Sequence, residues 1–484
     1  MRKAFHLRKR ILSSEAGPRY RFQRVKTTDI QALVSIVSPG NVVTGRDRLL
    51  DYGHDEAPLV KSSLPRIVVK PVNTASVSEI LKYANHKRIP VTTRGAGTGL
   101  SGGCIPLYGG IVLSLEHMHK VLNVDRENFA AVVQPGISLG KLRDNLGPFG
   151  LCYPVSLGEM TATVGGSIAT NAGGLNAVKY GVTRHHVLGL EAVLAGGEVI
   201  RTGGKFVKCS SGYDLTQLLV GSEGTLAVIT EVTLKLGIKA AFREALFVPF
   251  HSLQDAINSV PDILMLGKEP VGLEFMEKSI MQIAESYTGK KLPYGGYEAF
   301  LLVLSEADSQ DEITAYFSEV EKAVKKHGAA DALMPPGQLA MRRLLEAREM
   351  FYHAIKKYAP MQILDAVVPR SEIAHFVSRV KELEPKYGIP VVIYGHAGDG
   401  NVHLHPICKD MPLNTWKRKL KGLMKDIYAL GSEYGGAVSG EHGIGIDKKE
   451  FFNSTASSTL LGTMKKIKKA LDPNGILNPG KIFD

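Results

Sequence analysis

Two glycine-rich stretches place the strongest limits on how this chain folds. Residues 95–103 contain five glycines in nine positions, directly after a segment, 89–94, that is predicted to be a strand. Closely spaced glycines let backbone N–H groups converge on an anion, most often a phosphate or pyrophosphate. Residues 161–174 again combine glycines with hydroxyl side chains and an asparagine. Together the stretches predict a ligand with a pyrophosphate and an extended aromatic ring system. Taken alone, the first is also compatible with a flexible turn.

The order of residues in the first stretch argues against the two commonest phosphate-binding loops. No Gly-Lys-Ser/Thr follows it, so it is not a Walker loop, and residues 95–100 lack the third glycine of the G-x-G-x-x-G dinucleotide fingerprint. A Rossmann-type site is therefore a poor assignment.

The length of 484 residues requires more than one hydrophobic core. Strands predicted at 66–71 and 89–94 flank a helix, which makes a small βαβ-like unit, and further strands are expected at 111–115 and 130–134. After residue 238 the patterns lengthen and indicate a second α+β domain. Its helices are predicted at 252–260, 310–327, 338–358 and 371–388.

Two later segments combine histidines with a glutamate. Residues 395–403 read GHAGDGNVH, and residues 440–443 read GEHG. His396, His403 and Glu441 offer two imidazoles and a carboxylate, which suits a catalytic divalent metal, Zn²⁺ or Mn²⁺, that keeps open coordination positions. The alternative is a set of histidines satisfied within a polar core. His405 shares a strand face with His403, and both substrate contact and support of the metal ligands remain open for it.

The net charge of +12 is concentrated at the N-terminus. Residues 1–26 hold nine basic side chains against Glu15 alone, so nine minus one, or +8, lies there. No basic binding face remains, which argues against nucleic-acid binding. The arm is expected to be solvated, to make peripheral contact with an anionic membrane, or to act as a mitochondrial presequence.

The four cysteines are widely spaced, and no run of 18 apolar residues occurs. We therefore expect no iron–sulfur cluster, zinc ribbon or transmembrane helix in this chain. Free thiols fit a reducing compartment, so a cytoplasmic location is expected, with a peripheral membrane or mitochondrial location as the alternative.

Several motifs together resemble a known family. The run from Val91 through Gly103 resembles the pyrophosphate loop of FAD-binding enzymes of the vanillyl-alcohol oxidase type, and 164–181, 220–226 and 478–481 resemble its other flavin contacts. GHAGDGNVH and SGEHGIG resemble the D-2-hydroxy-acid dehydrogenases, which include the GlcD component of glycolate oxidase and the dehydrogenases of D-lactate and D-2-hydroxyglutarate. The resemblance covers about residues 40 to 484.

The resemblance implies an α+β fold with a two-subdomain, PCMH-type FAD-binding domain and an α+β cap that contains an antiparallel sheet. It implies a basic arm and first helix at 1–40, an FAD-binding domain at 41–237, a substrate and cap domain with the metal site at 238–446, and a segment returning to the FAD domain at 447–484. The FAD is expected to be noncovalent. Its expected contacts are Arg94, Gly95, Ala96, Gly97, Thr98, Gly99, Leu100, Ser101, Gly102, Pro154, Thr161, Thr163, Gly165, Gly166, Asn171, Gly173, Gly174, Tyr180, Gly181, Glu223, Gly224, Ile229 and Asn478.

The expected reaction is oxidation of a D-2-hydroxy acid to the 2-oxo acid. His442 is the candidate general base, because imidazole titrates near neutral pH, and the resemblance places Arg348 at the substrate carboxylate. The 2-hydroxyglutarate branch has a lysine shortly before the position of Asp365, and this chain has none there, which favours D-lactate or glycolate.

Two alternatives stay open at this point. The chain could be the flavin subunit of a complex that passes electrons to an electron-transfer flavoprotein or an iron–sulfur partner. It could also be a non-redox FAD transferase of the same fold, although the GHAGDGNVH segment speaks against that.

Overall fold

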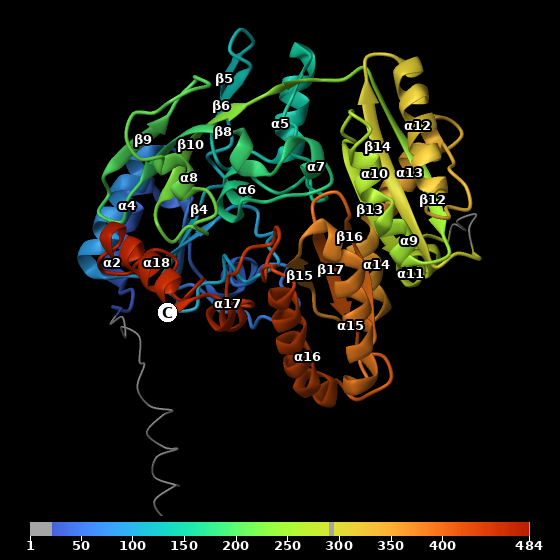
Figure 1. Ribbon diagram of the computed structural model, residues 1–484. Coiled ribbons are helices and arrows are strands. Elements are labelled where there is room, and N and C mark those ends of the chain that lie inside the picture. Colours follow the sequence, from blue (N-terminus) through green and yellow to red (C-terminus); the bar gives the residue numbers. More distant parts are fainter. Residues whose placement is uncertain (1–21, 290–294, 484) are drawn as a thin grey trace, which may run out of the picture.

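The computed structural model describes residues 22–289 and 295–483, which form two lobes (Figure 1). The first lobe contains two larger sheets and the second lobe contains one. Most of the basic arm, residues 1–21, lies outside the described residues, and so do the expectations about its partners. Among the described residues, no helix is both long enough and apolar enough to cross a bilayer.

The first sheet confirms the predicted βαβ-like unit. Its strand order is β1-β2-β4-β3, with β2 and β3 each parallel to β4 and β1 antiparallel to β2. Because β2 and β3 run the same way, the chain must cross over between them, and α4 supplies that crossover. The elements are α2 (Thr27–Val37), β1 (Val42–Val43), α3 (Arg46–Leu49), β2 (Ile67–Val69), α4 (Thr74–Lys87), β3 (Val91–Arg94) and β4 (Ile111–Ser114).

The second sheet of the first lobe is antiparallel, with strand order β5-β6-β10-β8-β9. Its elements are β5 (Val121–Asp125), β6 (Ala130–Val133), α5 (Leu139–Leu146), α6 (Val164–Thr170), α7 (Ala177–Tyr180), β8 (Val187–Val193), β9 (Val199–Gly203), α8 (Leu215–Leu219) and β10 (Val228–Lys235). A short pair, β7 (Leu151–Cys152) and β11 (Gly237–Ile238), lies beside it.

The second lobe is built on a six-stranded sheet that is antiparallel throughout, as expected for the cap. Its order is β12-β14-β13-β16-β17-β15. The strands are β12 (Phe242–Phe250), β13 (Gly272–Glu277), β14 (Ala299–Ala307), β15 (Leu364–Val367), β16 (Val391–His396) and β17 (Asn401–Pro406).

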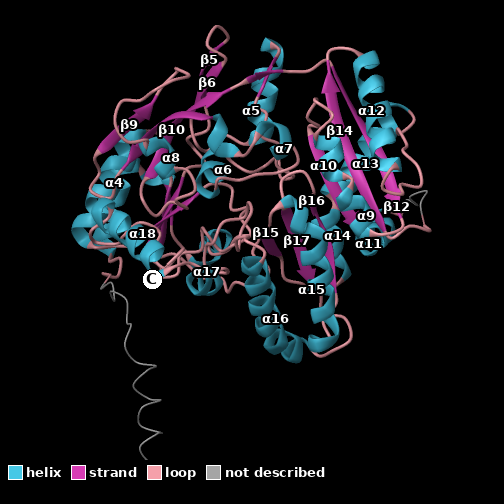
Figure 2. Ribbon diagram, viewed as in Figure 1, coloured by secondary structure: helices cyan, strands magenta, loops and turns pink. Residues whose placement is uncertain are grey.

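Helices cover both faces of this sheet (Figure 2). One face packs against α9 (Leu253–Asn258), α10 (Val260–Leu264), α12 (Gln310–Lys325), α15 (Ile373–Tyr387) and α16 (Leu413–Glu433). The other face packs against α11 (Lys278–Thr288), α13 (Gly337–Glu349) and α14 (Phe351–Tyr358). The predicted single helix at 338–358 is therefore wrong: it is two helices, because Met350, with ψ near −4°, interrupts the helical path.

Side chains alternate between the two faces of the sheet along β16 and β17, and this alternation determines which face carries the histidines. Ile393 and Leu404 belong to the core under α15 and α16, whereas Tyr394 belongs to the core under α14. Since neighbouring residues of a strand point to opposite faces, His396 and His403 lie on the face that carries α13 and α14.

The end of the chain returns to the first lobe (Figure 1), where Asn474 Nδ2 donates to Asn85 Oδ1 of α4 at 2.8 Å. It contains α17 (Lys449–Thr455) and α18 (Ser458–Leu471). Leu477 pairs in parallel with Val91 of β3, and the buried Lys468 ammonium donates to the carbonyl of Thr225 at 2.6 Å. The tail therefore completes the first lobe.

Candidate active site

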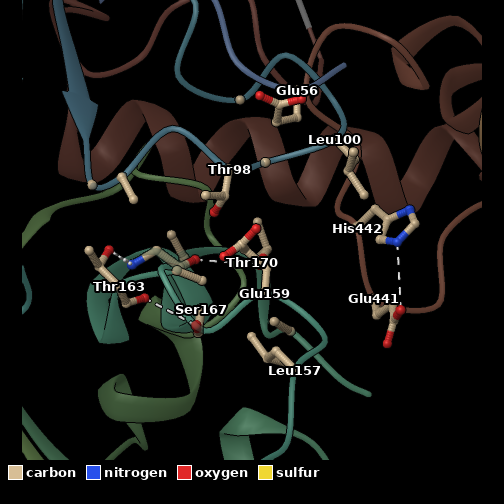
Figure 3. Close-up of a pocket in the computed structure, with 18 of the residues that line it drawn as sticks. Glu56, Thr98, Leu100, Leu157, Glu159, Thr163, Ser167, Thr170, Glu441 and His442 are labelled. Carbon is tan, nitrogen blue, oxygen red and sulfur yellow. Dashed lines mark hydrogen bonds and ion pairs between the residues drawn. The ribbon is translucent and has the colours of Figure 1, made fainter. Parts of the chain in front are cut away.

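A cavity of about 730 Å³ lies between the two lobes. The first lobe contributes the loop after β3, the region around α6, the segment 222–229 that leads into β10, and Asn478. The second lobe contributes one side of α13 and α14, strands β16 and β17, and the segment that carries Glu441 and His442. Figure 3 shows Thr98 and Leu100 on one wall, Thr163 and Thr170 on another, and Glu441 beside His442 on a third.

The glycines of the loop after β3 allow it to pack tightly on its own support. A Cβ on Gly97, whose φ is +81°, would lie 2.0 Å from Nη2 of Arg94. Arg94 donates to the carbonyl of His54 at 2.6 Å and contacts Cys104 Sγ at 3.1 Å. Arg94 therefore supports the loop from behind and does not line the cavity.

The second glycine-rich stretch forms α6 and a turn that reaches toward the metal-ligand candidates. Thr163 caps α6 by accepting a hydrogen bond from the N–H of Gly166 at 3.3 Å. A Cβ on Gly173 would lie 3.2 Å from Glu441 Oε2. Glycine at position 173 thus lets the wall of the first lobe come close to the histidine cluster.

The structure brings the three predicted metal ligands together. Nε2 of His396 and Nε2 of His403 are 3.3 Å apart, and Glu441 Oε1 lies 3.8 Å from the first and 3.4 Å from the second. All three side chains are largely buried and line the cavity. Glu441 comes from a loop, as expected.

Glu274 on β13 is a residue that no sequence motif singled out. Its side chain is fully buried and accepts from His396 Nδ1 at 2.5 Å and from Arg348 Nε at 2.9 Å. Burial works to raise the pKa of Glu274, but the charges of His396 and Arg348 hold it below its ordinary value. In the neutral, metal-binding form of His396, the Nδ1–H bond to Glu274 would leave the Nε2 lone pair toward the cluster.

The pKa values of the two histidines of the cluster are shifted in opposite directions. Burial opposes the charged form of His396, yet the neighbouring Glu274 carboxylate holds the pKa of His396 well above its usual range. Burial lowers the pKa of His403 to about 3, so His403 is neutral at physiological pH. A neutral imidazole is the form that binds a metal.

His442 lies next to the cluster. Its Nε2 is 3.6 Å from Glu441 Oε1, its Nδ1 is 3.7 Å from Asp365 Oδ2, and its ring is parallel to that of His403 at 5.4 Å. The dashed contact in Figure 3 joins His442 to Glu441. His405, by contrast, does not line the cavity: it stacks on Tyr394 and contacts Met361 Sδ at 3.4 Å.

Arg348 also lines the cavity, but half of its guanidinium is already engaged. Nε and Nη2 both donate to Glu274, and the planar group lies 4.7 Å from the centre of the Tyr394 ring. In the described part of the chain, Nη1 has no hydrogen-bond partner. A substrate carboxylate would therefore meet Arg348 at Nη1 and not along the Nε edge.

Most of the residues predicted to contact FAD line this cavity, and a minority do not. Those on the wall are Gly95, Ala96, Gly97, Thr98, Gly99, Leu100, Ser101, Thr161, Thr163, Gly165, Gly166, Gly173, Gly174, Glu223, Gly224, Ile229 and Asn478. Those away from it are Arg94, Gly102, Pro154, Asn171, Tyr180 and Gly181. Tyr180, for example, donates its hydroxyl to Glu306 of the second lobe, and Asn171 accepts from the N–H of Arg184 at 3.0 Å.

Comparison with known proteins agrees with this arrangement. Residues 65–203 match the family model described as FAD binding domain, and residues 239–482 match the one described as FAD linked oxidases, C-terminal domain. D-lactate dehydrogenase of Archaeoglobus fulgidus is 43% identical over 442 residues, which span 89% of this chain and 95% of that protein. The chain belongs to the FAD-linked oxidases.

Other relatives of this FAD-linked oxidase confirm the resemblance predicted from the motifs. Glycolate oxidase subunit GlcD of Bacillus subtilis is 38% identical over 462 residues, covering 94% of this chain and 97% of that protein. The solved structure of p-cresol methylhydroxylase superposes with a TM-score of 0.78 at 18% identity, over 94% of this chain and 96% of that one. The predicted PCMH-type fold is therefore confirmed.

The cavity of the FAD-linked oxidase has the chemistry that a flavin nucleotide requires. Thr93 Oγ1 and Asp55 Oδ2 are buried polar atoms without hydrogen-bond partners among the described residues, and both side chains line the cavity. Such atoms are normally satisfied, so they indicate that a polar ligand occupies the space. Glycine-rich walls and a volume of about 730 Å³ fit the same ligand.

The histidine cluster also fits a divalent metal. Two imidazoles and one carboxylate face one another, with donor atoms that all lie within 4.8 Å. Glu274 supports His396 from behind, which is the arrangement that orients a metal-binding histidine.

Proposed function

We propose that this FAD-linked oxidase oxidises a D-2-hydroxy acid, with D-lactate or glycolate as the substrate, to the 2-oxo acid. The observation that carries the proposal is that the metal-ligand candidates, His442 and Arg348 all line the same cavity as the glycine-rich walls. The relatives named D-lactate dehydrogenase and glycolate oxidase subunit GlcD support the substrate class.

In this proposal FAD, when bound, supplies the acceptor for the hydride that leaves C2 of the acid. His396, His403 and Glu441 would hold a Zn²⁺ or Mn²⁺ ion, whose contribution is to polarise the substrate hydroxyl. Removal of the hydroxyl proton and binding of the substrate carboxylate are assigned to side chains of the protein.

His442 would take the hydroxyl proton at Nε2, the ring nitrogen that lies on the Glu441 side. Its Nδ1 is turned toward Asp365, whose pKa is held well below its usual value: burial raises it, but the charges of Lys448 and His442 outweigh burial. A permanently ionised Asp365 favours the ring orientation in which Nε2 faces the cavity.

Arg348 would bind the substrate carboxylate through Nη1. Leu345 and Ile363 line the cavity, whereas Gln362 does not and donates to Asp447 at 2.8 Å. These two apolar side chains support a short aliphatic acid as the substrate.

The direct test is anaerobic reduction of the bound flavin. The purified protein should be yellow and should bleach with D-lactate or glycolate, whereas L-lactate should leave the spectrum unchanged. If none of D-lactate, glycolate and D-2-hydroxyglutarate bleaches the flavin, the proposal is wrong. His442→Asn should keep the flavin but slow bleaching by about 10²–10⁴-fold, the usual contribution of a general base.

The electron acceptor is a second part of the proposal. The four cysteines are free and dispersed, so they provide no iron–sulfur cluster to carry electrons onward. We therefore propose that the reduced flavin passes its electrons to an electron-transfer flavoprotein or an iron–sulfur protein. Reoxidation of the bleached enzyme by such a protein, and not by nicotinamide cofactors, would support this.

A further inference from the structure

The segment that carries Glu441 and His442 is held by two buried carboxylates from different lobes. Asp365 lies on β15 in the second lobe and Glu223 lies in the 222–229 segment of the first lobe, and neither was predicted to have this role. Their contacts divide the segment 439–445 into two halves, and each carboxylate binds one half.

Asp365 binds the first half. Its Oδ2 accepts from the backbone N–H groups of Gly440 at 3.1 Å, Glu441 at 3.1 Å and His442 at 2.9 Å. Ser439 Oγ and the fully buried Lys448 ammonium donate to the same oxygen at 2.8 and 3.2 Å. Three consecutive N–H groups on one oxygen fix the backbone from which the metal-ligand candidate and the base candidate project.

Glu223 binds the second half across the boundary between the lobes. Oε1 accepts from the N–H of Ile444 and Oε2 from the N–H of Gly445, both at 2.7 Å. The backbone carbonyl of Glu223 is in turn held by Asn478 Nδ2 at 2.7 Å. Glu223 was expected to contact FAD, but its carboxylate is directed at the segment that carries the reactive side chains.

The flavin loop adds direct contacts to the same segment. Ser101 Oγ donates to the carbonyl of His442 at 3.0 Å, and the Ser101 carbonyl accepts from the N–H of Ile446 at 2.8 Å. A Cβ on Gly445 would lie 2.0 Å from that carbonyl, so glycine is needed for the approach.

We infer that Glu223 and Asp365 are positioning residues that hold residues 439–445 as one rigid unit between the lobes, and that they thereby set Glu441 and His442 against the flavin. The catalytic part of this inference rests on the proposed function, whereas the rigidity of the segment does not. An error of about 1 Å in the placement of a reacting group can cost about a hundredfold in rate, so loosening either carboxylate should act on the chemical step.

The experiment compares Glu223→Gln, Asp365→Asn and the wild type as FAD-loaded full-length proteins. Hydrogen–deuterium exchange is followed in peptides that cover 439–443 and 444–448. Both variants should exchange at least tenfold faster in both peptides, although Glu223 accepts backbone N–H groups only of the second peptide and Asp365 only of the first. The flavin should stay bound. The rate of anaerobic flavin reduction at saturating D-lactate should fall at least tenfold, with KM changed less than threefold.

Glu191→Gln is the matched control. Glu191 is also a buried carboxylate with several donors, Thr74, Thr230 and Arg201, but it lies on β8 away from the segment. It should lower the thermal midpoint without changing exchange at 439–448 or the reduction rate. If Glu223→Gln fails to fold, Glu223→Asp, which keeps the charge but shortens the reach by one methylene, takes its place.

Faster exchange confined to the peptide whose backbone N–H groups each carboxylate binds would overturn the inference, because the segment would then be two independent halves. Unchanged reduction rates in both variants would also overturn it. If no hydroxy acid bleaches the wild type, the proposed function fails, and the exchange measurement alone still decides whether the segment is one unit.

Discussion

Glu274 joins two of the predicted site residues through the two oxygens of one carboxylate, one bonded to His396 and the other to Arg348. Glu274→Gln removes the charge that both cations face in a fully buried site. We expect metal affinity to fall about 10- to 100-fold, as for other partners of metal-binding histidines, with the flavin retained. Mn²⁺ titration of the chelator-treated, FAD-loaded protein measures this. Glu277→Gln, on the same strand but paired with Lys381, should bind Mn²⁺ like the wild type, and equal loss in both variants would contradict the role of Glu274.

The three metal-ligand candidates could be predicted from the sequence, whereas the carboxylates that hold them in place could not. His396, His403 and Glu441 sit in glycine-rich segments whose residue types predict a metal site. The structure brings the three side chains together, and metal binding by them stays a prediction. Glu274 stands in an apolar strand with no neighbouring motif, because its function depends on β13 pairing with β16 across more than a hundred residues of chain. Asp365 likewise acts through backbone N–H groups, which leave no mark in the sequence.

At the scale of elements, the loop after β3 depends on glycine for its own packing as much as for its ligand. Gly97→Ala would place a methyl group 2.0 Å from Arg94 Nη2 on a residue whose φ is +81°, and a left-handed conformation alone costs roughly 1–2 kcal/mol. We expect the flavin-to-protein absorbance ratio of the purified variant to fall several-fold. Gly147→Ala, where a Cβ meets nothing within 4 Å, should purify with full flavin content. A full flavin content in Gly97→Ala would contradict this prediction, because it would show that the loop can rearrange to accept the methyl group.

The sequence pattern predicted that the second lobe contains helices in this region, but it did not predict where one helix ends and the next begins. Periodicity indicated one helix at 338–358, yet the chain turns at Met350. Arg348 therefore lies in the last turn of α13, while Phe351 begins α14 and packs in the core. A helical pattern continues across such a turn, since both halves bury residues on the same sheet face. The position of Arg348 therefore follows from packing against β13 and β16, which a local pattern does not contain.

At the scale of the whole molecule, stability should depend on pH through His186. This side chain is buried in the first lobe, and burial, with a smaller effect of the Lys235 charge, lowers the pKa of His186 to about 4. The unfolded chain has a pKa near 6.5 there and binds the proton first, so stability is lost as pH falls from about 6.5 to 4, by up to about 3 kcal/mol. The thermal midpoint of His186→Gln should therefore fall less between pH 7.5 and 4.5 than that of the wild type. The exposed His375→Gln should follow the wild type, and parallel curves for all three proteins would refute this role of His186.

The return of the chain end to the first lobe has a consequence for biosynthesis. Leu477 pairs with Val91, and Lys468 is buried against Thr225, so the first lobe lacks part of its interior until residues 468–477 have left the ribosome. The second lobe lies wholly within the intervening sequence and has its own core. Domains generally fold as units while the chain emerges. The second lobe should thus be complete first, and the nucleotide cradle should close only after residues 468–477 have emerged.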